Sequence, residues 1–187
     1  MSEKVRPLRA DAARNRALVL ETAYRAFATE GLSVAVDEIA HRAGVGIGTV
    51  YRHFPTKTAL FAAAVEHRLG QIVTAGRALL DDGDPGEALF GFVRSMATDW
   101  GAADRGLTQV IAGDDIGTAQ IDAAETQFMS LLAELVTAAQ QAGTVIPELT
   151  PREAKAVIVA CQAVGTHTPD VADRVISLVL NGIRPAG

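Results

Sequence analysis

One short stretch of the chain carries side chains suited to contacting an anionic polymer. After the glycine-rich segment 44–46, Val50 and Phe54 lie four positions apart and so share one face of a short helix. The other face has small residues, hydroxyls and nitrogen donors, and no carboxylate. A helix that enters the DNA major groove needs this chemistry, because donors bond phosphate oxygens and base edges. The residues that we predict to contact DNA are Ile47, Gly48, Thr49, Tyr51, Arg52, His53 and Lys57.

These side chains have different expected roles. We expect Tyr51 and Lys57 to contact phosphates, and Lys57 opens the next helix, where the helix dipole also favours anions. Gly48 and Thr49 should lie nearest the base edges. His53 is assigned to this surface because it lies beside Tyr51 on the same short helix.

Another short helix precedes this one in the chain. Val36, Ile39, Ala40 and Ala43 recur with the i, i+3, i+4, i+7 spacing of one apolar helix face. The glycines of segment 44–46 favour the left-handed backbone that closes a helix. Residues 35–54 therefore read as a helix-turn-helix whose second helix binds DNA.

The run DEIAHRAGVGIGTVYRHFPTKTALF resembles the helix-turn-helix signature of the tetracycline-repressor (TetR) family of bacterial one-component regulators. The resemblance implies an all-α homodimer with an N-terminal DNA-binding domain and a C-terminal domain that binds a ligand and dimerises. Family members usually have Thr or Ser before the Val of the first motif helix. Ala35 stands there in this chain and is a poor N-cap, so Ser33 is the candidate to replace it.

Composition and charge agree with a globular DNA-binding protein. The chain has 187 residues, 49% of them hydrophobic and 21% charged, enough to form one domain or two small ones. Of its 17 Lys and Arg residues nine fall in 1–57, against six of its 22 acids. The remaining residues therefore hold eight basic and sixteen acidic side chains. We predict a basic helix-turn-helix domain at 1–58 and an acidic effector-binding and dimerisation domain at 59–187.

Several other classes of protein fit the sequence poorly. No apolar run reaches the length of a membrane span and the first residues lack a signal-peptide core, so we expect a cytoplasmic protein without membrane contact. The single cysteine excludes an internal disulfide. The four histidines form no metal-ligand cluster, and GVGIG lacks the Lys-Ser/Thr of a phosphate loop. No metal and no cofactor are expected.

Apolar spacing and capping signals predict an all-α fold of about nine helices. Residues 1–10 read as a flexible basic arm, and the first helix should run from Asp11 to Gly31. Thr56 should cap the fourth helix, which continues to 82, and a short helix is expected within 101–113. Thr150 and Thr168, each followed by Pro, should cap the last two helices.

The C-terminal domain carries two further candidate surfaces. Aromatic residues together with Met, His and Gln side chains suit a mostly apolar effector pocket, although ordinary core packing explains each aromatic equally well. This candidate pocket consists of His67, Gln71, Phe92, Met96, Trp100 and Phe128. The last two helices are apolar on more than one face, which suits a four-helix dimer interface. The candidate interface residues are Val157, Cys161, Val164, Val171, Val175, Leu178 and Val179.

These features predict a homodimeric repressor that leaves a palindromic operator in double-stranded DNA when a small molecule binds. An activator or a ligand-independent regulator of the same fold is the alternative within this class. A small helical enzyme that uses the C-terminal cavity is the alternative from another class, although no Ser/His/Asp arrangement with convincing spacing is present. We therefore predict a protein that is not an enzyme.

Overall fold

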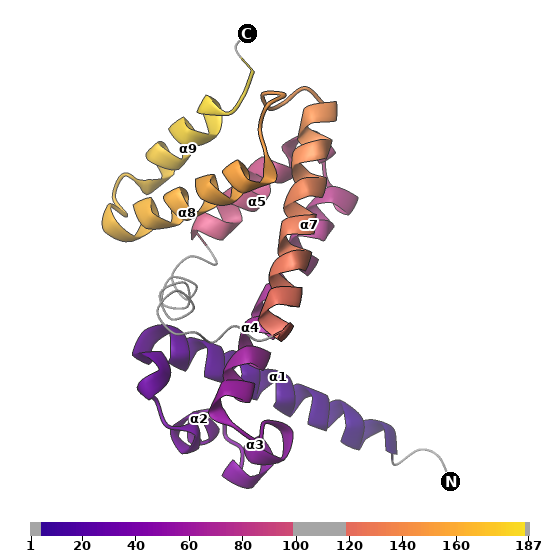
Figure 1. The fold of residues 1–187 in the computed structure, drawn as a ribbon, viewed down its shortest axis with the longest axis vertical. Coiled ribbons are helices and arrows are strands. Elements are labelled where there is room, and N and C mark those ends of the chain that lie inside the picture. Colours follow the sequence, from indigo (N-terminus) through magenta and orange to yellow (C-terminus); the bar gives the residue numbers. More distant parts are fainter. Residues whose placement is uncertain (1–4, 99–118, 186–187) are drawn as a thin grey trace. The chain divides into compact units, whose positions relative to one another are not determined.

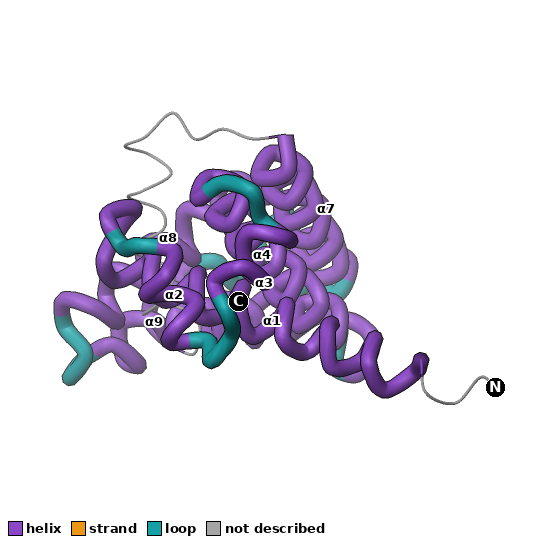
Figure 2. Tube along the Cα trace, turned by 90° about the horizontal axis from the view of Figure 1, so that it is seen from below, coloured by secondary structure: helices purple, strands orange, loops and turns teal. Residues whose placement is uncertain are grey.

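The computed structural model of this chain describes residues 5–98 and 119–185, and all its regular elements are helical. Figure 1 and Figure 2 show helices joined by short loops, with no strand in these two segments. The prediction of an all-α fold is confirmed. The elements are α1 (Val5–Glu30), η1 (Gly31–Ser33), α2 (Val36–Arg42), α3 (Ile47–His53), α4 (Lys57–Asp82), α5 (Pro85–Thr98), α7 (Ala119–Gln141), α8 (Pro151–His167) and α9 (Ala172–Gly182). The short helix expected within 101–113 lies outside the described residues.

The described residues fall into two compact units. We call residues 5–69 and 119–122 the head, and residues 70–98 and 123–185 the body. The division falls inside α4, between Leu69 and Gly70, whereas the sequence predicts a domain boundary between residues 58 and 59. The first turns of α4 belong to the head because they contribute to its core.

The core of the head joins α1 to α4 and supports the two short helices. The fully buried rings of Phe27 and Phe61 meet edge to face, with 5.4 Å between their centroids. Ile39 from α2 and Val50 from α3 are also buried, while α2 packs on both α1 and α3. Apolar burial from four helices therefore fixes the orientation of α3, whose seven residues are too few for a helix to be stable alone.

The first helix begins earlier than the sequence predicts. It starts at Val5, so the predicted cap at Asp11 is wrong, and so is the flexible arm for residues 5–10. The predicted cap lies inside the helix, where its carboxylate pairs with Arg14. Pro7 does not prevent this start, because the N–H groups of the first turn have no partner within a helix.

The core of the body is formed by helices α4, α5, α7, α8 and α9. Leu89, Phe92, Leu131 and Ile176 are among its fully buried side chains. A Cβ built at Gly76 of α4 would lie 2.5 Å from Leu131 Cδ2 and 2.9 Å from Phe92 Cε2. Gly76 therefore lets α4 approach α5 and α7 more closely than any other residue would allow.

The two predicted C-terminal caps have different outcomes. Thr150 forms the full capping box of α8: its hydroxyl accepts from the Glu153 N–H at 3.2 Å, and Glu153 Oε2 accepts from the Thr150 N–H at 2.8 Å. The Thr150 hydroxyl also donates to Glu153 Oε2 at 2.7 Å, and this bond, followed by the bond from the Thr150 N–H, lowers the pKa of Glu153. The predicted cap at Thr168 is wrong, because α9 begins at Ala172 and Val171 precedes it without a side-chain cap. Thr168 instead ends α8, where its hydroxyl donates to the Val164 carbonyl at 3.2 Å.

None of the described helices is long and apolar enough to cross a membrane.

Candidate nucleic-acid interface

The turn between α2 and α3 uses its two glycines for different purposes. Gly44 has φ 67°, and its N–H donates to the His41 carbonyl while the Val45 N–H donates to the Ala40 carbonyl. This pair of bonds is a Schellman motif, which needs the left-handed residue that glycine supplies. Gly46 is extended, with φ −67° and ψ 138°, and precedes the first residue of α3. Only Gly44 fulfils the prediction of left-handed backbone.

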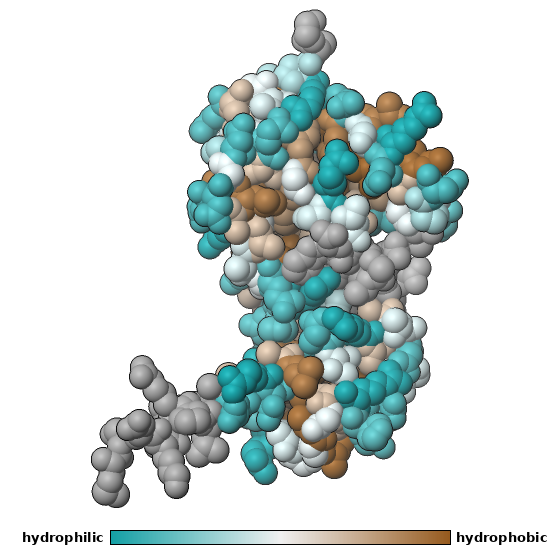
Figure 3. Space-filling model, turned by 180° about the vertical axis from the view of Figure 1, so that it is seen from behind, coloured by the Kyte–Doolittle hydropathy of each residue, from teal (hydrophilic) through white to brown (hydrophobic). Residues whose placement is uncertain are grey.

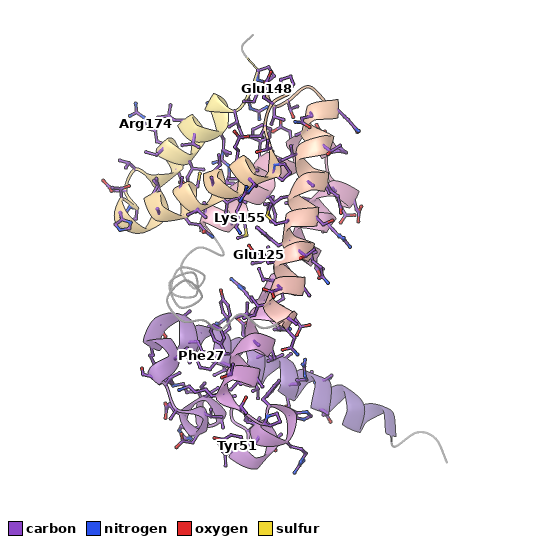
Figure 4. All side chains as sticks on the ribbon, in the orientation of Figure 1. Phe27, Tyr51, Glu125, Glu148, Lys155 and Arg174 are labelled. Atoms are coloured by element: carbon purple, nitrogen blue, oxygen red, sulfur yellow. The ribbon has the colours of Figure 1, made fainter. Side chains whose placement is uncertain are left out.

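The predicted DNA-contacting residues lie mainly on the accessible side of α3. Val50 and Phe54 are 1% and 5% exposed and face inward, as predicted. Tyr51 and Ile47 are 48% and 40% exposed, and Figure 4 shows Tyr51 at the outer edge of the head. The remaining members on α3 are exposed or half-buried: Gly48, Thr49, Arg52 and His53. The structure therefore presents the predicted residues of α3 together on one short helix.

The start of α4 contributes the last predicted residue. Thr56 caps this helix as predicted, because its hydroxyl accepts from the Ala59 N–H at 3.0 Å. Lys57 is the first residue of α4 and is half-buried. The positively charged side chain of Lys57 therefore extends from the start of a helix, where the free backbone N–H groups also favour an anion.

The start of α2 lacks a side-chain cap. Ala35 occupies the N-cap position with no side-chain hydrogen bond. Ser33 does not replace it, because its hydroxyl donates to the Glu30 carbonyl at 2.9 Å. The predicted substitution of Ser33 for the usual capping hydroxyl is therefore wrong.

An ion-pair cluster that the sequence analysis missed connects α2 to the end of α1. Arg42 Nε donates to Glu38 Oε1 at 2.7 Å, and the same guanidinium binds both carboxylate oxygens of Glu30. The pairing lowers the pKa of Glu30 and raises the pKa of Arg42. The i, i+4 spacing of Glu38 and Arg42 was a visible signal, whereas nothing local indicates the contact with Glu30.

A hollow between α1 and α3 was also missed. The polar side chains that line this hollow are Asn15 and Arg16 of α1 and Thr49, Arg52 and His53 of α3. The apolar lining residues are Ala12, Val19, Val50 and Phe54. No carboxylate lines this hollow, which sits beside the residues predicted to contact DNA. The i, i+3, i+4, i+7 spacing of its members on α1 could have indicated a common face.

Matches to family models settle the class of this protein. Residues 19–64 match the model of bacterial regulatory proteins of the tetR family, and residues 84–185 match the C-terminal domain of SbtR-like transcriptional regulators. The chain belongs to the TetR family. It is thus a transcriptional regulator of a DNA-binding, helix-turn-helix class.

Similar TetR-family structures cover nearly all of the chain. A TetR regulatory protein from Mycobacterium vanbaalenii is 48% identical, with 96% of this chain and 100% of that chain covered and a TM-score of 0.76. A TetR regulator from Streptomyces coelicolor is 30% identical, with 92% and 99% covered and a TM-score of 0.72. An HTH-type transcriptional regulator from Staphylococcus aureus is 34% identical over 76 residues, which are 40% of this chain and 41% of that protein. The similarity to this curated relative therefore spans less than half of its length.

The predicted effector residues of this TetR-family chain are only partly brought together. Phe92 and Phe128 lie in the body with their ring centroids 6.2 Å apart, and both are buried, as is Met96. His67 belongs to the head and Gln71 to the body, and both are half-buried. Trp100 lies outside the described residues. Within the body, the two phenylalanines, Met96 and Gln71 remain predicted effector residues.

The predicted dimer residues divide between surface and core. Cys161 has no exposed area within the chain, and this burial raises the pKa of its thiol. It therefore belongs to the core beneath α8. Val171 and Leu178 are exposed, while the half-buried members are Val157, Val164, Val175 and Val179. Val159 of α8 is a large apolar side chain that is 50% exposed, and it is not among the predicted interface residues.

Proposed function

We propose that this TetR-family chain is a homodimeric repressor that binds a palindromic operator and leaves it when a small molecule enters the body. The observation that carries the proposal is the accessible, carboxylate-free face of α3 in a family of DNA-binding regulators. A helix with side chains is about 10–12 Å across, and the major groove is about 12 Å wide. Such a helix fits the groove with its outer residues against the base edges. A regulator that acts on DNA in a bacterium works in the cytoplasm.

In this proposal the residues of α3 and α4 have separate roles in the complex. Gly48 carries no side chain and Thr49 a small one, so they suit close approach to base edges. The Tyr51 hydroxyl and the Lys57 ammonium suit phosphate oxygens, because one is an exposed donor and the other lies at a helix start. Arg52 is exposed and has no ion-pair partner within the described residues, so its charge is available to DNA.

The exposed apolar side chains of α8 and α9 support the proposed dimer. Val159 and Leu178 are 50% and 61% exposed. Figure 3 shows hydrophobic side chains gathered at the edge of the body that α8 and α9 form. A second copy that packs this face against its own would bury these side chains in a symmetric interface.

The packing of Phe92 suggests how an effector acts. Its ring lies against Phe128 on one side and close to Gly76 of α4 on another. A ligand that displaces this ring must also displace the backbone of α4, because no side chain separates them. The other half of α4 carries Phe61, part of the core of the head. Repression is then lost if the ligand favours the arrangement in which the heads no longer match the operator.

Genome-wide footprinting of the protein followed by a ligand screen against the operator found is the most informative test. Occupancy of discrete palindromic sites, with increased transcription of the neighbouring genes after deletion of the regulator, supports a repressor. Reduced transcription after deletion would instead identify an activator. Failure of every screened metabolite to release the protein would favour ligand-independent regulation.

Binding measurements test the docking surface directly. Lys57→Ala should weaken binding to all duplexes alike and lower the slope of log affinity against log salt by about one per head. Arg25→Ala is a matched control, since it removes one positive charge from an α1 residue that already pairs with Glu21 at 2.8 Å. If the Tyr51→Phe, Lys57→Ala double variant binds the operator as tightly as the wild type, the proposed docking is wrong.

A further inference from the structure

The hollow between α1 and α3 is lined by cationic and polar side chains that have no carboxylate partner in the described part of the head. Arg16 lies with its guanidinium carbon 5.5 Å from the centre of the Phe54 ring. Within the described residues, neither this guanidinium nor the side chain of Asn15 has a hydrogen bond or an ion pair to another side chain. Both side chains are exposed, and both line the same hollow.

The other arginines of α1 whose side chains the structure describes are neutralised. Arg14 pairs with Asp11, and Arg25 pairs with Glu21. Arg42 of α2 is likewise bound by two glutamates. Within the described part of the head, Arg16 and Arg52 lack a carboxylate partner, and both line the hollow. This distribution concentrates unneutralised positive charge beside α3.

The position of the hollow on α3 indicates which part of a DNA duplex would reach it. With Val50 facing inward, the helical period places Tyr51 on one flank of α3, and Thr49 and His53 on the other flank. His53 therefore does not lie beside Tyr51, contrary to the prediction from the sequence. A helix of this diameter in the major groove has one sugar–phosphate strand against each flank. The flank of Thr49 and His53 is the one that lines the hollow with α1.

We propose that Asn15 and Arg16 of α1 bind a DNA phosphate on the strand opposite the one contacted by Tyr51. The inference rests on the proposed docking of α3 and adds to it a phosphate contact on the second strand. Stacking on Phe54 holds the guanidinium at the end of α3, so the phosphate contact also fixes the angle of this helix in the groove. Together with the contacts of Tyr51, this contact binds both strands that border the groove.

The test uses the full-length protein and a duplex that it selects from a random-sequence library. Affinity and its salt dependence are measured for Asn15→Ala, Arg16→Ala and Arg16→Lys. Arg16→Ala should weaken binding about tenfold per head and lower the salt slope by about 0.9 per head. Asn15→Ala should weaken binding without a change of slope, and Arg16→Lys should keep the slope of the wild type. Arg25→Ala, whose charge is already paired, should match the wild type.

Neutralising single phosphates of the duplex identifies the bound group. With methylphosphonate substitutions, the wild type should lose affinity at the phosphate bound by Arg16. Arg16→Ala should show no further loss at that position while retaining the losses elsewhere. Equal losses for both proteins at every position would overturn the inference.

Two further results separate the inference from the docking proposal. If Lys57→Ala lowers the salt slope while Asn15→Ala and Arg16→Ala bind as the wild type does, α1 makes no phosphate contact and the docking proposal stands. If none of the three variants changes binding, both proposals are wrong. Asn15 has no contact with Phe54 among the described interactions, so its variant tests the site without disturbing that ring.

Discussion

The ring of Phe61 stands edge-on against the ring of Phe27, and through this contact the first turns of α4 belong to the head. Both rings are completely buried. The contact explains why the compact units divide inside α4 and not at its first residue. It also makes α4 the segment through which a change in the body would reach the DNA-binding helices in the proposed mechanism.

Removing this contact should destabilise the head. Phe61→Ala deletes a fully buried aromatic ring and leaves a cavity, so we expect a loss of about 3–5 kcal/mol in the free energy of unfolding. Urea unfolding followed by circular dichroism measures the change. Leu18→Ala is the control, because Leu18 is half exposed and its truncation should change stability by less than about 0.5 kcal/mol. Similar losses in both variants would argue against this core.

The two glycines of the turn should differ in their sensitivity to substitution. A Cβ at Gly44 meets nothing within 4 Å, so Gly44→Ala costs only the strain of a left-handed backbone, about 1–2 kcal/mol. Gly46→Ser should change stability by no more than a few tenths of a kcal/mol, because an extended residue before α3 suits serine. Urea midpoints of both variants check the difference. Equal midpoints would contradict the assigned turn.

The helix-turn-helix was predictable from sequence because its signals are local. The spacing of Val36, Ile39 and Ala40, followed by the glycines, indicates both α2 and the turn. The capping box of Thr150 is equally local. The start of α1 was missed because Asp11 resembles a cap, while Pro7 is tolerated in a first turn.

The surfaces of the body were less predictable because α8 is apolar on several faces. Val157, Val159 and Cys161 have similar hydropathy, and no single period separates the buried ones from the exposed ones. Packing against α5 decides the outcome: Cys161 is buried and Val159 is half exposed. The hollow of Asn15 and Arg16 was missed for a related reason, since it needs two helices that are distant in the sequence.

The exposed apolar face of the body should be required for dimerisation. The double variant Val159→Asp, Leu178→Asp places charges where the proposed interface is apolar, so we expect monomers. The sequence-based choice of Val175→Asp with Leu178→Asp should have the same effect. Light scattering after size exclusion gives the mass. Leu18→Asp, a control on an exposed leucine of the head, should leave the dimer intact. An unchanged mass in both double variants would place the interface elsewhere.

A surface ion pair in the body should give a pH-dependent contribution to stability. Arg184 donates to both carboxylate oxygens of Glu87 at 2.8–2.9 Å and lies 3.9 Å from the centre of the Phe90 ring. Its guanidinium lowers the pKa of Glu87 below the ordinary value of 4.5. At pH values above the ordinary pKa the carboxylate therefore contributes its full stabilisation to the fold. This stabilisation is lost as the pH falls through the lowered pKa.

Glu87→Gln separates the charge from the packing of Arg184 on Phe90. At pH 7 the variant should be less stable than the wild type by about 0.2–1 kcal/mol, because both side chains are partly exposed. The difference should shrink at acid pH, where the wild-type carboxylate is protonated. Urea midpoints over a pH series provide the measurement. Glu148→Gln, an exposed residue with no ion pair in the described segments, should show no such trend.

In the proposed complex, two α3 helices, one from each subunit, bind two inverted half-sites of one operator. The centres of such half-sites lie about 34 Å apart, one helical turn, on the same side of the duplex. A mobility-shift series at fixed salt, in which the centre of the selected operator is lengthened stepwise, tests this geometry. We predict that adding about 5 bp, half a turn, abolishes tight binding because one half-site rotates to the opposite side. Equal affinity at every spacing would mean that each head binds alone, and that the two subunits do not bind one operator together.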